Sequence, residues 1–300
     1  MQIKRDSANS DGAMQIKKIE SVTLYSDDIP GAKEAVNKEC VESQDSTGRF
    51  VIGVSQPQLT AYWPDANLRN GCAVVICPGG GYRGLSVDKE GDAIALRLVK
   101  LGISAFVLKY RLPCDDTMDN RKLGPLQDVQ QALQLVKSHA TEWQLDLAKI
   151  GVMGFSAGGH VASCAAVHYQ RPVLPTLSPV MIKPAFQILI YPVISMDPQI
   201  THSGSKALLI GEDASPADIE YFSNDRQVNS DSPRAFIMHA NDDVNVSVEN
   251  SLCYYRALMA SQVPVQLLLL ADGGHGFGMY HNYDWFQSLT MWLKVNQLIS

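Results

Sequence analysis

One five-residue stretch, Gly154-Phe155-Ser156-Ala157-Gly158, constrains the fold of this 300-residue chain more than any other. The apolar run before it, 150–153, predicts a buried strand, and the residues from Val161 onward predict a helix. A tight strand-to-helix turn needs small residues on both sides of its apex, because the two backbones nearly touch. Ser156 would stand at that apex with its hydroxyl held outward, facing the positive end of the helix. The pattern is typical of the nucleophile of a serine hydrolase.

The pattern G-x-S-x-G is short, and composition alone would produce it in about one chain in ten of this length. A serine hydroxyl is a weak nucleophile, so it needs a base, and the base needs an acid to orient it. Acyl transfer also needs donors aimed at the negative charge that develops on the substrate. A functional site therefore requires these three groups elsewhere in the chain.

Strands and helices alternate from Cys72 to the end of the chain. This alternation predicts an α/β protein with a mostly parallel eight-stranded sheet and helices on both faces. The expected strands are 49–54, 58–64, 72–77, 104–109, 150–153, 186–191, 235–239 and 265–270, the first two forming an antiparallel edge. Helices are expected from Ser86, Pro125, Val161, Ser215, Val248 and Tyr283, and 192–214 looks loop-rich. No linker divides the chain, so we expect a flexible leader over 1–20 and one domain over 21–300.

Composition excludes several classes of function. Hydrophobic residues make up 46% of the chain and charged residues 19%, which allows a sizeable core. The net charge is −6 with no basic block, which argues against nucleic-acid binding, and no apolar run is long enough to span a membrane. The six cysteines form no C-x-x-C pair, and the N-terminus shows no secretory signal, although a signal removed earlier would leave no trace. We therefore expect reduced thiols and a cytoplasmic protein.

Among the seven histidines, His275 is the best placed to act as the base. It follows the last predicted strand, in the glycine-rich loop 272–278, where a flexible backbone can bring an imidazole against another loop. His281, six residues further on, is the alternative. The remaining assignments are structural or peripheral: His160 packs or caps locally, His239 is satisfied near a strand end, and His139 and His168 are exposed on helices.

The acid is expected in the loop that follows the strand 235–239. Two adjacent carboxylates stand there, Asp242 and Asp243, and because they point in different directions only one can bind His275. We favour Asp243 and keep Asp242 as the alternative. The order Ser156, Asp243, His275 along the chain is the order found in α/β-hydrolases.

Backbone donors are expected from the run Pro78-Gly79-Gly80-Gly81, which follows the strand 72–77. Gly80 and Gly81 would offer their amides to the oxyanion, together with the amide of Ala157 at the start of the helix. A phosphate-binding loop is the competing interpretation, but neither a following Lys-Ser/Thr nor G-x-G-x-x-G is present. A metal cluster of His239, Asp242 and Asp243 has no supporting ligand spacing, so we expect no metal.

Four motifs together resemble the α/β-hydrolase esterases related to acetylxylan and feruloyl esterases. They are Val74–Tyr82, Gly102–Pro113, Gly154–His160 and Gly273–Phe277, and the resemblance covers the chain from about Leu24 to its end. It implies an α/β-hydrolase fold with little or no cap, and a single catalytic domain over 21–300. It also implies hydrolysis of carboxylic esters, commonly deacetylation of sugars, without a cofactor.

Two positions depart from the pattern of related proteins. Many members of the wider hormone-sensitive-lipase group have a histidine before the three glycines, whereas this chain has Pro78, which removes a side chain that braces the loop. The acid loop commonly reads D-x-x-V-P, whereas here it runs from Asp243 to Ser247 with serine in place of proline. Neither change moves the register of the expected site.

The sequence thus favours a serine carboxylesterase acting on small acyl esters, with acetylated carbohydrate as the foremost substrate class. Tyr82, Arg83 and the segment 192–215, with His202, are expected to line the substrate pocket. One alternative is a peptidase or amidase like the prolyl oligopeptidases, whose large extra domain does not fit in 300 residues. Another is a hydrolase fold kept as a non-catalytic binding module. The acyl group, the alcohol and the oligomeric state stay open.

Overall fold

An eight-stranded sheet runs through the centre of the computed structural model, which describes residues 18–46 and 48–300. The strand order is β1-β4-β7-β5-β8-β9-β10-β11. β4 pairs antiparallel with both β1 and β7, and every other neighbouring pair is parallel. The strands are β1 (Lys18–Val22), β4 (Gln58–Trp63), β5 (Ala73–Cys77), β7 (Ser104–Lys109), β8 (Ile150–Phe155), β9 (Phe186–Ile190), β10 (Arg234–Ala240) and β11 (Val265–Leu270).

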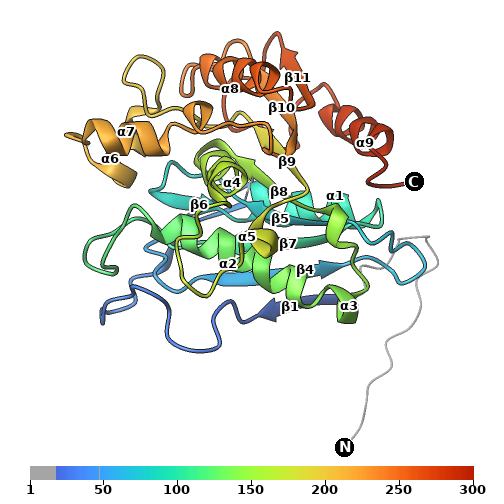
Figure 1. Ribbon diagram of the computed structural model, residues 1–300, viewed down its shortest axis with the longest axis horizontal. Coiled ribbons are helices and arrows are strands. Elements are labelled where there is room, and N and C mark those ends of the chain that lie inside the picture. Colours follow the sequence, from blue (N-terminus) through green and yellow to red (C-terminus); the bar gives the residue numbers. More distant parts are fainter. Residues whose placement is uncertain (1–17, 47) are drawn as a thin grey trace, which may run out of the picture.

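Helices cover both faces of this sheet, as predicted (Figure 1). On one face α2 (Gly124–Ser138), α4 (Ser156–His168) and α8 (Glu249–Ala260) share a hydrophobic core with the sheet. On the other face α1 (Ala93–Val99) and α9 (Trp285–Val295) enclose a second core. The continuous apolar runs of β5 and β8 follow from this sandwich, because a strand covered on both sides buries every residue.

A second, antiparallel sheet, which the sequence did not predict, consists of β2 (Cys40–Asp45), β3 (Gly48–Ile52) and β6 (Gly84–Ser86). The expected strand over 49–54 belongs to it and not to the edge of the main sheet. That edge is β1 instead, which pairs with β4 and begins at Lys18, so the predicted leader over 1–20 is three residues too long. Residues 1–17 of that leader lie outside the described residues.

The segment expected to be loop-rich, 192–214, contains α6 (Ser203–Ile210). The next helix, α7 (Pro216–Phe222), begins as predicted, with the Ser215 side chain accepting a hydrogen bond from the amide of Asp218. The remaining short helices are α3 (Ala140–Trp143), α5 (Pro179–Ile182) and the 3₁₀ turns Leu147–Lys149 and Asn224–Arg226. Over the part of the chain that is described, no helix combines the length and apolar character needed to cross a bilayer.

The helix expected from Ser86 starts differently, with a π-helical turn over Asp88–Asp92 that continues into α1. Its wide hydrogen bonds run from the amide of Asp92 to the carbonyl of Val87, and from the amide of Ala93 to that of Asp88. Hydrophobic spacing could not reveal this turn, because the apolar positions of α1 that follow it keep the ordinary helical period.

Candidate active site

A sharp turn joins β8 to α4 at Ser156. The serine has φ of +51°, a left-handed conformation that costs free energy for any residue with a β-carbon. The turn is as tight as the sequence requires, since a β-carbon on Gly154 would lie 2.1 Å from the carbonyl oxygen of Gly158. The strained geometry places Ser156 at the N-terminus of a 13-residue helix, where the helix dipole favours negative charge.

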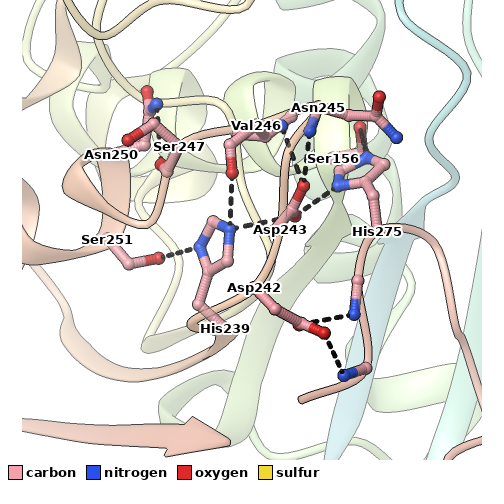
Figure 2. A network of polar contacts seen from close by, with 12 residues as sticks. Ser156, His239, Asp242, Asp243, Asn245, Val246, Ser247, Asn250, Ser251 and His275 are labelled. Carbon is pink, nitrogen blue, oxygen red and sulfur yellow. Dashed lines mark hydrogen bonds and ion pairs between the residues drawn. The ribbon is translucent and has the colours of Figure 1, made fainter. Parts of the chain in front are cut away.

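Two further loops bring their side chains to Ser156 (Figure 2). His275, in the loop after β11, has its Nε2 2.8 Å from the Ser156 hydroxyl oxygen. Its Nδ1 lies 2.6 Å from Oδ2 of Asp243, in the loop after β10. Because an ionised carboxylate can only accept, Nδ1 carries the proton and Nε2 accepts the hydroxyl proton of Ser156. The three residues thus form one hydrogen-bonded chain beyond the carboxyl ends of three strands.

The Asp243 carboxylate is buried and fully hydrogen-bonded. Its Oδ1 accepts from the amides of Asn245 and Val246, both at 2.9 Å, while Nε2 of His239 donates to its Oδ2 at 3.1 Å. Burial alone would raise the pKa of this carboxyl, but the bonds from His239, His275 and the Val246 amide outweigh burial and hold it well below its usual range. Asp243 is therefore ionised whenever the imidazole beside it gains a proton.

The two alternatives from the sequence occupy other positions. Asp242 turns away from the imidazole and accepts the amide of Gly274 at 2.8 Å, which ties the acid loop to the histidine loop (Figure 2). His281 donates to the carbonyl of Asp272 at 2.9 Å and accepts the amide of Tyr283 at the same distance. Both residues shape the loop around His275 without contacting Ser156.

The loop after β5 brings two glycines to the pocket of Ser156. Gly80 and Gly81 line the same pocket as Ser156, and within 18–46 and 48–300 neither amide donates to a protein acceptor. Gly80 has φ of +144°, and a β-carbon there would lie 2.1 Å from the carbonyl oxygen of Gly84, so only glycine fits. Ala157 is the second residue of α4, where amides lack intrahelical partners. These three amides are the candidate oxyanion donors.

A pocket of about 400 Å³ opens beside Ser156 and His275. Arg83 lies on its wall, paired with Glu42 at 2.6 Å and stacked over the ring of Phe50 at 4.8 Å. His202, also on the wall, accepts the amide of Ser205 at its Nδ1. Burial, together with the neighbouring imidazole of His275, lowers the pKa of His202. Its neutral ring therefore carries the proton on Nε2.

Three sequence predictions about side chains are wrong. His139 is not exposed on a helix: it lies half-buried between α2 and α3, stacked on the ring of Trp143 at 4.7 Å. Tyr82 does not line the pocket: it is buried, and its hydroxyl donates to Nδ1 of His160 at 2.7 Å, because the positive φ of Tyr82 turns the ring inward. His168 is not exposed but buried, stacked on the ring of Tyr221 at 4.1 Å and donating to the carbonyl of that residue. Tyr221 belongs to α7, and helical periodicity cannot anticipate a contact from so distant a segment.

Two polar residues near the site were missed entirely. Glu90 is buried inside the π turn and lines the pocket beside Ser156, and Tyr191 packs its ring 5.0 Å from that of His275. Neither belongs to a recognisable motif. The only sequence signal is that Glu90 comes after the glycine-rich loop and Tyr191 comes directly after a strand. Across the described residues, no three His, Cys, Asp or Glu side chains are grouped so that they could hold a metal ion.

The BD-FAE family profile matches residues 59–258. An acetylxylan esterase of Xylanibacter ruminicola is 36% identical over 258 residues, covering 82% of this chain and 50% of that protein. An endo-1,4-beta-xylanase B of Butyrivibrio fibrisolvens is 33% identical over 222 residues, covering 73% of this chain and 34% of that protein.

The crystal structure of an acetyl ester-xyloside bifunctional hydrolase from Caldicellulosiruptor lactoaceticus is 32% identical and superimposes with a TM-score of 0.76. The match covers 94% of this chain and 97% of that one. The chain thus spans about half the length of one curated relative and a third of the other, while it matches this solved structure along almost its whole length. Together with the sheet order, the likeness establishes the α/β-hydrolase fold predicted from the sequence.

Proposed function

This chain belongs to the BD-FAE family, and from that membership we propose that it is a serine carboxylesterase of small acyl esters, foremost of acetylated carbohydrates. The observation that carries the proposal is the hydrogen-bonded chain from Ser156 through His275 to Asp243, beside two glycine amides that have no protein acceptor in the described chain. The relatives that act on acetylxylan or acetyl esters support the substrate class. We further propose that residues 21–300 form a single catalytic domain.

In the first half of the reaction, Ser156 Oγ attacks the ester carbonyl carbon while His275 Nε2 takes the hydroxyl proton. The carbonyl oxygen becomes an oxyanion that the amides of Gly80, Gly81 and Ala157 stabilise, each donor contributing about 3 kcal/mol. The Asp243 carboxylate stabilises the imidazolium. His275 then gives its proton to the leaving alcohol oxygen as the carbon–oxygen bond breaks, which leaves an acyl group on Ser156.

In the second half, water takes the place of the alcohol. His275 Nε2 removes a proton from the water as its oxygen attacks the acyl carbon, and the same amides hold the second oxyanion. Breakdown of this intermediate returns the proton to Ser156 Oγ and releases the carboxylic acid. All of these steps use residues of this chain and one water molecule.

We propose that His202 and Arg83 bind the alcohol part of the substrate. Nδ1 of His202 is occupied by the Ser205 amide, so the free Nε2–H is a donor for a hydroxyl or ring oxygen. Arg83 is half-exposed on the pocket wall, where the face of its guanidinium turned away from Phe50 offers a flat surface to a sugar ring.

The decisive experiment measures hydrolysis of p-nitrophenyl acetate, acetylated xylose and longer acyl esters by the wild-type protein and by Ser156→Ala. The wild-type protein should turn over the short esters, and Ser156→Ala should lose at least about 10³-fold in kcat. Similar rates for the two proteins would contradict the proposal. An anilide that is cleaved as fast as the matching ester would indicate an amidase instead.

A further inference from the structure

The loop that carries Gly80 and Gly81 lacks the histidine brace found in the wider hormone-sensitive-lipase group, because Pro78 occupies that position. The structure shows what holds the loop here. The carbonyl oxygen of Pro78 accepts the hydroxyl of Tyr110 at 2.8 Å, and the amide of Gly79 donates to Oε2 of Glu90 at 2.8 Å. This carbonyl and this amide belong to the same peptide group. Both polar atoms of the peptide are therefore fixed, one residue before the first proposed oxyanion donor.

Glu90 reaches Gly79 because of the π turn that contains it. Glu90 is 3% exposed, and a β-carbon on Gly79 would lie 2.6 Å from its Oε2 and 2.9 Å from the β-carbon of Ser156. Single π turns are rare, and they are frequent at functional sites. Burying a carboxyl group costs free energy that an apolar side chain of similar size would not. A buried carboxyl in so rare a turn, this close to the nucleophile, calls for a role beyond packing.

The second oxygen of the same carboxyl group reaches the opposite loop. Oε1 of Glu90 accepts the hydroxyl of Tyr191 at 2.8 Å, and that hydroxyl accepts the amide of Gly278 at 3.0 Å. Gly278 lies three residues after His275. Tyr191 has φ of +36° although it is fully buried, a strained conformation that the surrounding contacts must maintain. Its ring packs 5.0 Å from that of His275.

We propose that Glu90 and Tyr191 are positioning residues that hold the oxyanion loop and the histidine loop in one fixed relation. The continuous path runs from the Gly79 amide through Glu90 and the Tyr191 hydroxyl to the Gly278 amide. Neither residue is hydrogen-bonded to Ser156 or His275. Their effect is on transition-state geometry, where a displacement of about 1 Å can cost on the order of 100-fold in rate. The inference rests on the proposed esterase function.

The test compares Glu90→Leu, Glu90→Gln and Tyr191→Phe with the wild-type protein on p-nitrophenyl acetate. Glu90→Leu should lower kcat about 10- to 100-fold and Tyr191→Phe about 10-fold, with KM changed less than about threefold. Glu90→Gln should recover part of the rate, since its carbonyl oxygen can still accept from Gly79 and its nitrogen can donate to the Tyr191 oxygen, although the Tyr191 proton then loses its acceptor. Binding of a trifluoromethyl ketone, which forms the oxyanion, should weaken by the same factor as kcat/KM falls.

Tyr62→Phe is the matched control, because it removes a hydroxyl that donates at 2.6 Å to Asp92, on the same π turn but outside the pocket. Its kcat should stay within about twofold of wild type. In the double variant Glu90→Leu/Tyr191→Phe, kcat should be no lower than in Glu90→Leu alone, because both substitutions break one path.

The inference is overturned if Glu90→Leu and Tyr191→Phe keep the wild-type kcat, if they raise KM only, or if Tyr62→Phe slows the reaction as much. A Glu90→Gln variant as slow as Glu90→Leu would also contradict positioning through hydrogen bonds. If Glu90→Leu does not fold, Tyr191→Phe decides. Wild-type turnover that Ser156→Ala abolishes is measured first, so that a failure of the esterase proposal is distinguished from a failure of this one.

Discussion

Two histidines near the turn at Ser156, His275 and His160, differ in burial and in the polar groups that surround them. His275 lies at the pocket with its side chain 16% exposed, between the Ser156 hydroxyl and the Asp243 carboxylate. His160, one turn after Ser156 on α4, is 0% exposed. It accepts the hydroxyl of Tyr82 and donates to the carbonyl of Phe222.

The comparison shows how the surroundings decide what an imidazole can do. Burial lowers the pKa of His160 to about 4, and none of its polar partners is a carboxylate that could stabilise a positive charge. His275 has such a carboxylate, and its second nitrogen faces a hydroxyl at an accessible pocket. The surroundings of His275 allow it to accept a proton and release it again. Those of His160 keep it neutral, and its hydrogen bond to Phe222 connects α4 to the end of α7.

Removing each imidazole in turn should separate the two clusters most clearly. His275→Ala should lower kcat/KM for p-nitrophenyl acetate on the order of 10⁴-fold or more, because the base is lost, while the melting temperature changes little. His160→Ala should instead destabilise the protein by about 2–4 kcal/mol, through a cavity and two unpaired partners. The folded His160→Ala protein should keep a kcat/KM for p-nitrophenyl acetate within a few fold of wild type. A reversed pattern would refute the assignment.

The adjacent residues Asp243 and Asp242 allow the same comparison for the acid that orients His275. Asp243→Asn should reduce kcat about 10³- to 10⁴-fold, since the amide cannot stabilise an imidazolium and can force the wrong tautomer. Asp242→Asn is the matched control. Its side-chain oxygen can still accept the Gly274 amide, so the rate should fall less than about tenfold. Steady-state kinetics on purified variants measure both effects, and equal losses would leave no reason to prefer Asp243.

The depressed pKa of His160 predicts how stability depends on pH. Between about pH 6.5 and pH 4 the unfolded chain binds a proton at this residue and the folded chain does not. The contribution of His160 to the free energy of unfolding is therefore fully present above pH 6.5. It falls by roughly 3 kcal/mol as the pH drops towards 4. Urea unfolding at several pH values should show this loss in the wild-type protein, together with that of His168, whose pKa burial also lowers to about 4. In His160→Gln the free energy of unfolding should fall less steeply with decreasing pH. The same pH dependence in both proteins would contradict a neutral buried imidazole at His160.

The smallest effect is expected at the partner of His160. Tyr82→Phe removes the hydroxyl bound to Nδ1 and should destabilise the protein by about 1–2 kcal/mol, measured by urea unfolding. The ring stays in place, so kcat on the folded enzyme should change less than about threefold. A large loss of kcat without a loss of stability would instead place Tyr82 in the active site, where the sequence had suggested it.

The polar groups beyond the strand ends could be predicted, because the apolar runs of the sequence show where the buried strands end. Apolar runs locate the buried strands, and in a parallel sheet the residues just beyond their carboxyl ends must meet. That reasoning led to Ser156, Asp243 and His275, which the structure brings into hydrogen-bonding contact. It also led to Gly80 and Gly81, which line the same pocket.

What could not be predicted depends on contacts between distant segments. Tyr82 and Arg83 are adjacent in sequence, yet Tyr82 is buried and bonded to His160 while Arg83 reaches the pocket, because Tyr82 has a positive φ within the turn 80–84. Glu90 points inward only because a π turn rotates it, and apolar spacing carries no trace of that turn. The partner of β4 at the sheet edge was also missed, since β1 is a short polar strand without clear alternation.

The left-handed backbone at Ser156 has a consequence for how this protein evolves. Among the residue types, glycine adopts φ of +51° at the least cost, so Ser156→Gly should be more stable than the wild-type protein by about 1 kcal/mol while hydrolysing nothing. Selection for stability alone would therefore remove the serine, and only selection for activity keeps it. A lineage that no longer needs the reaction should drift towards glycine at this position before it loses the fold.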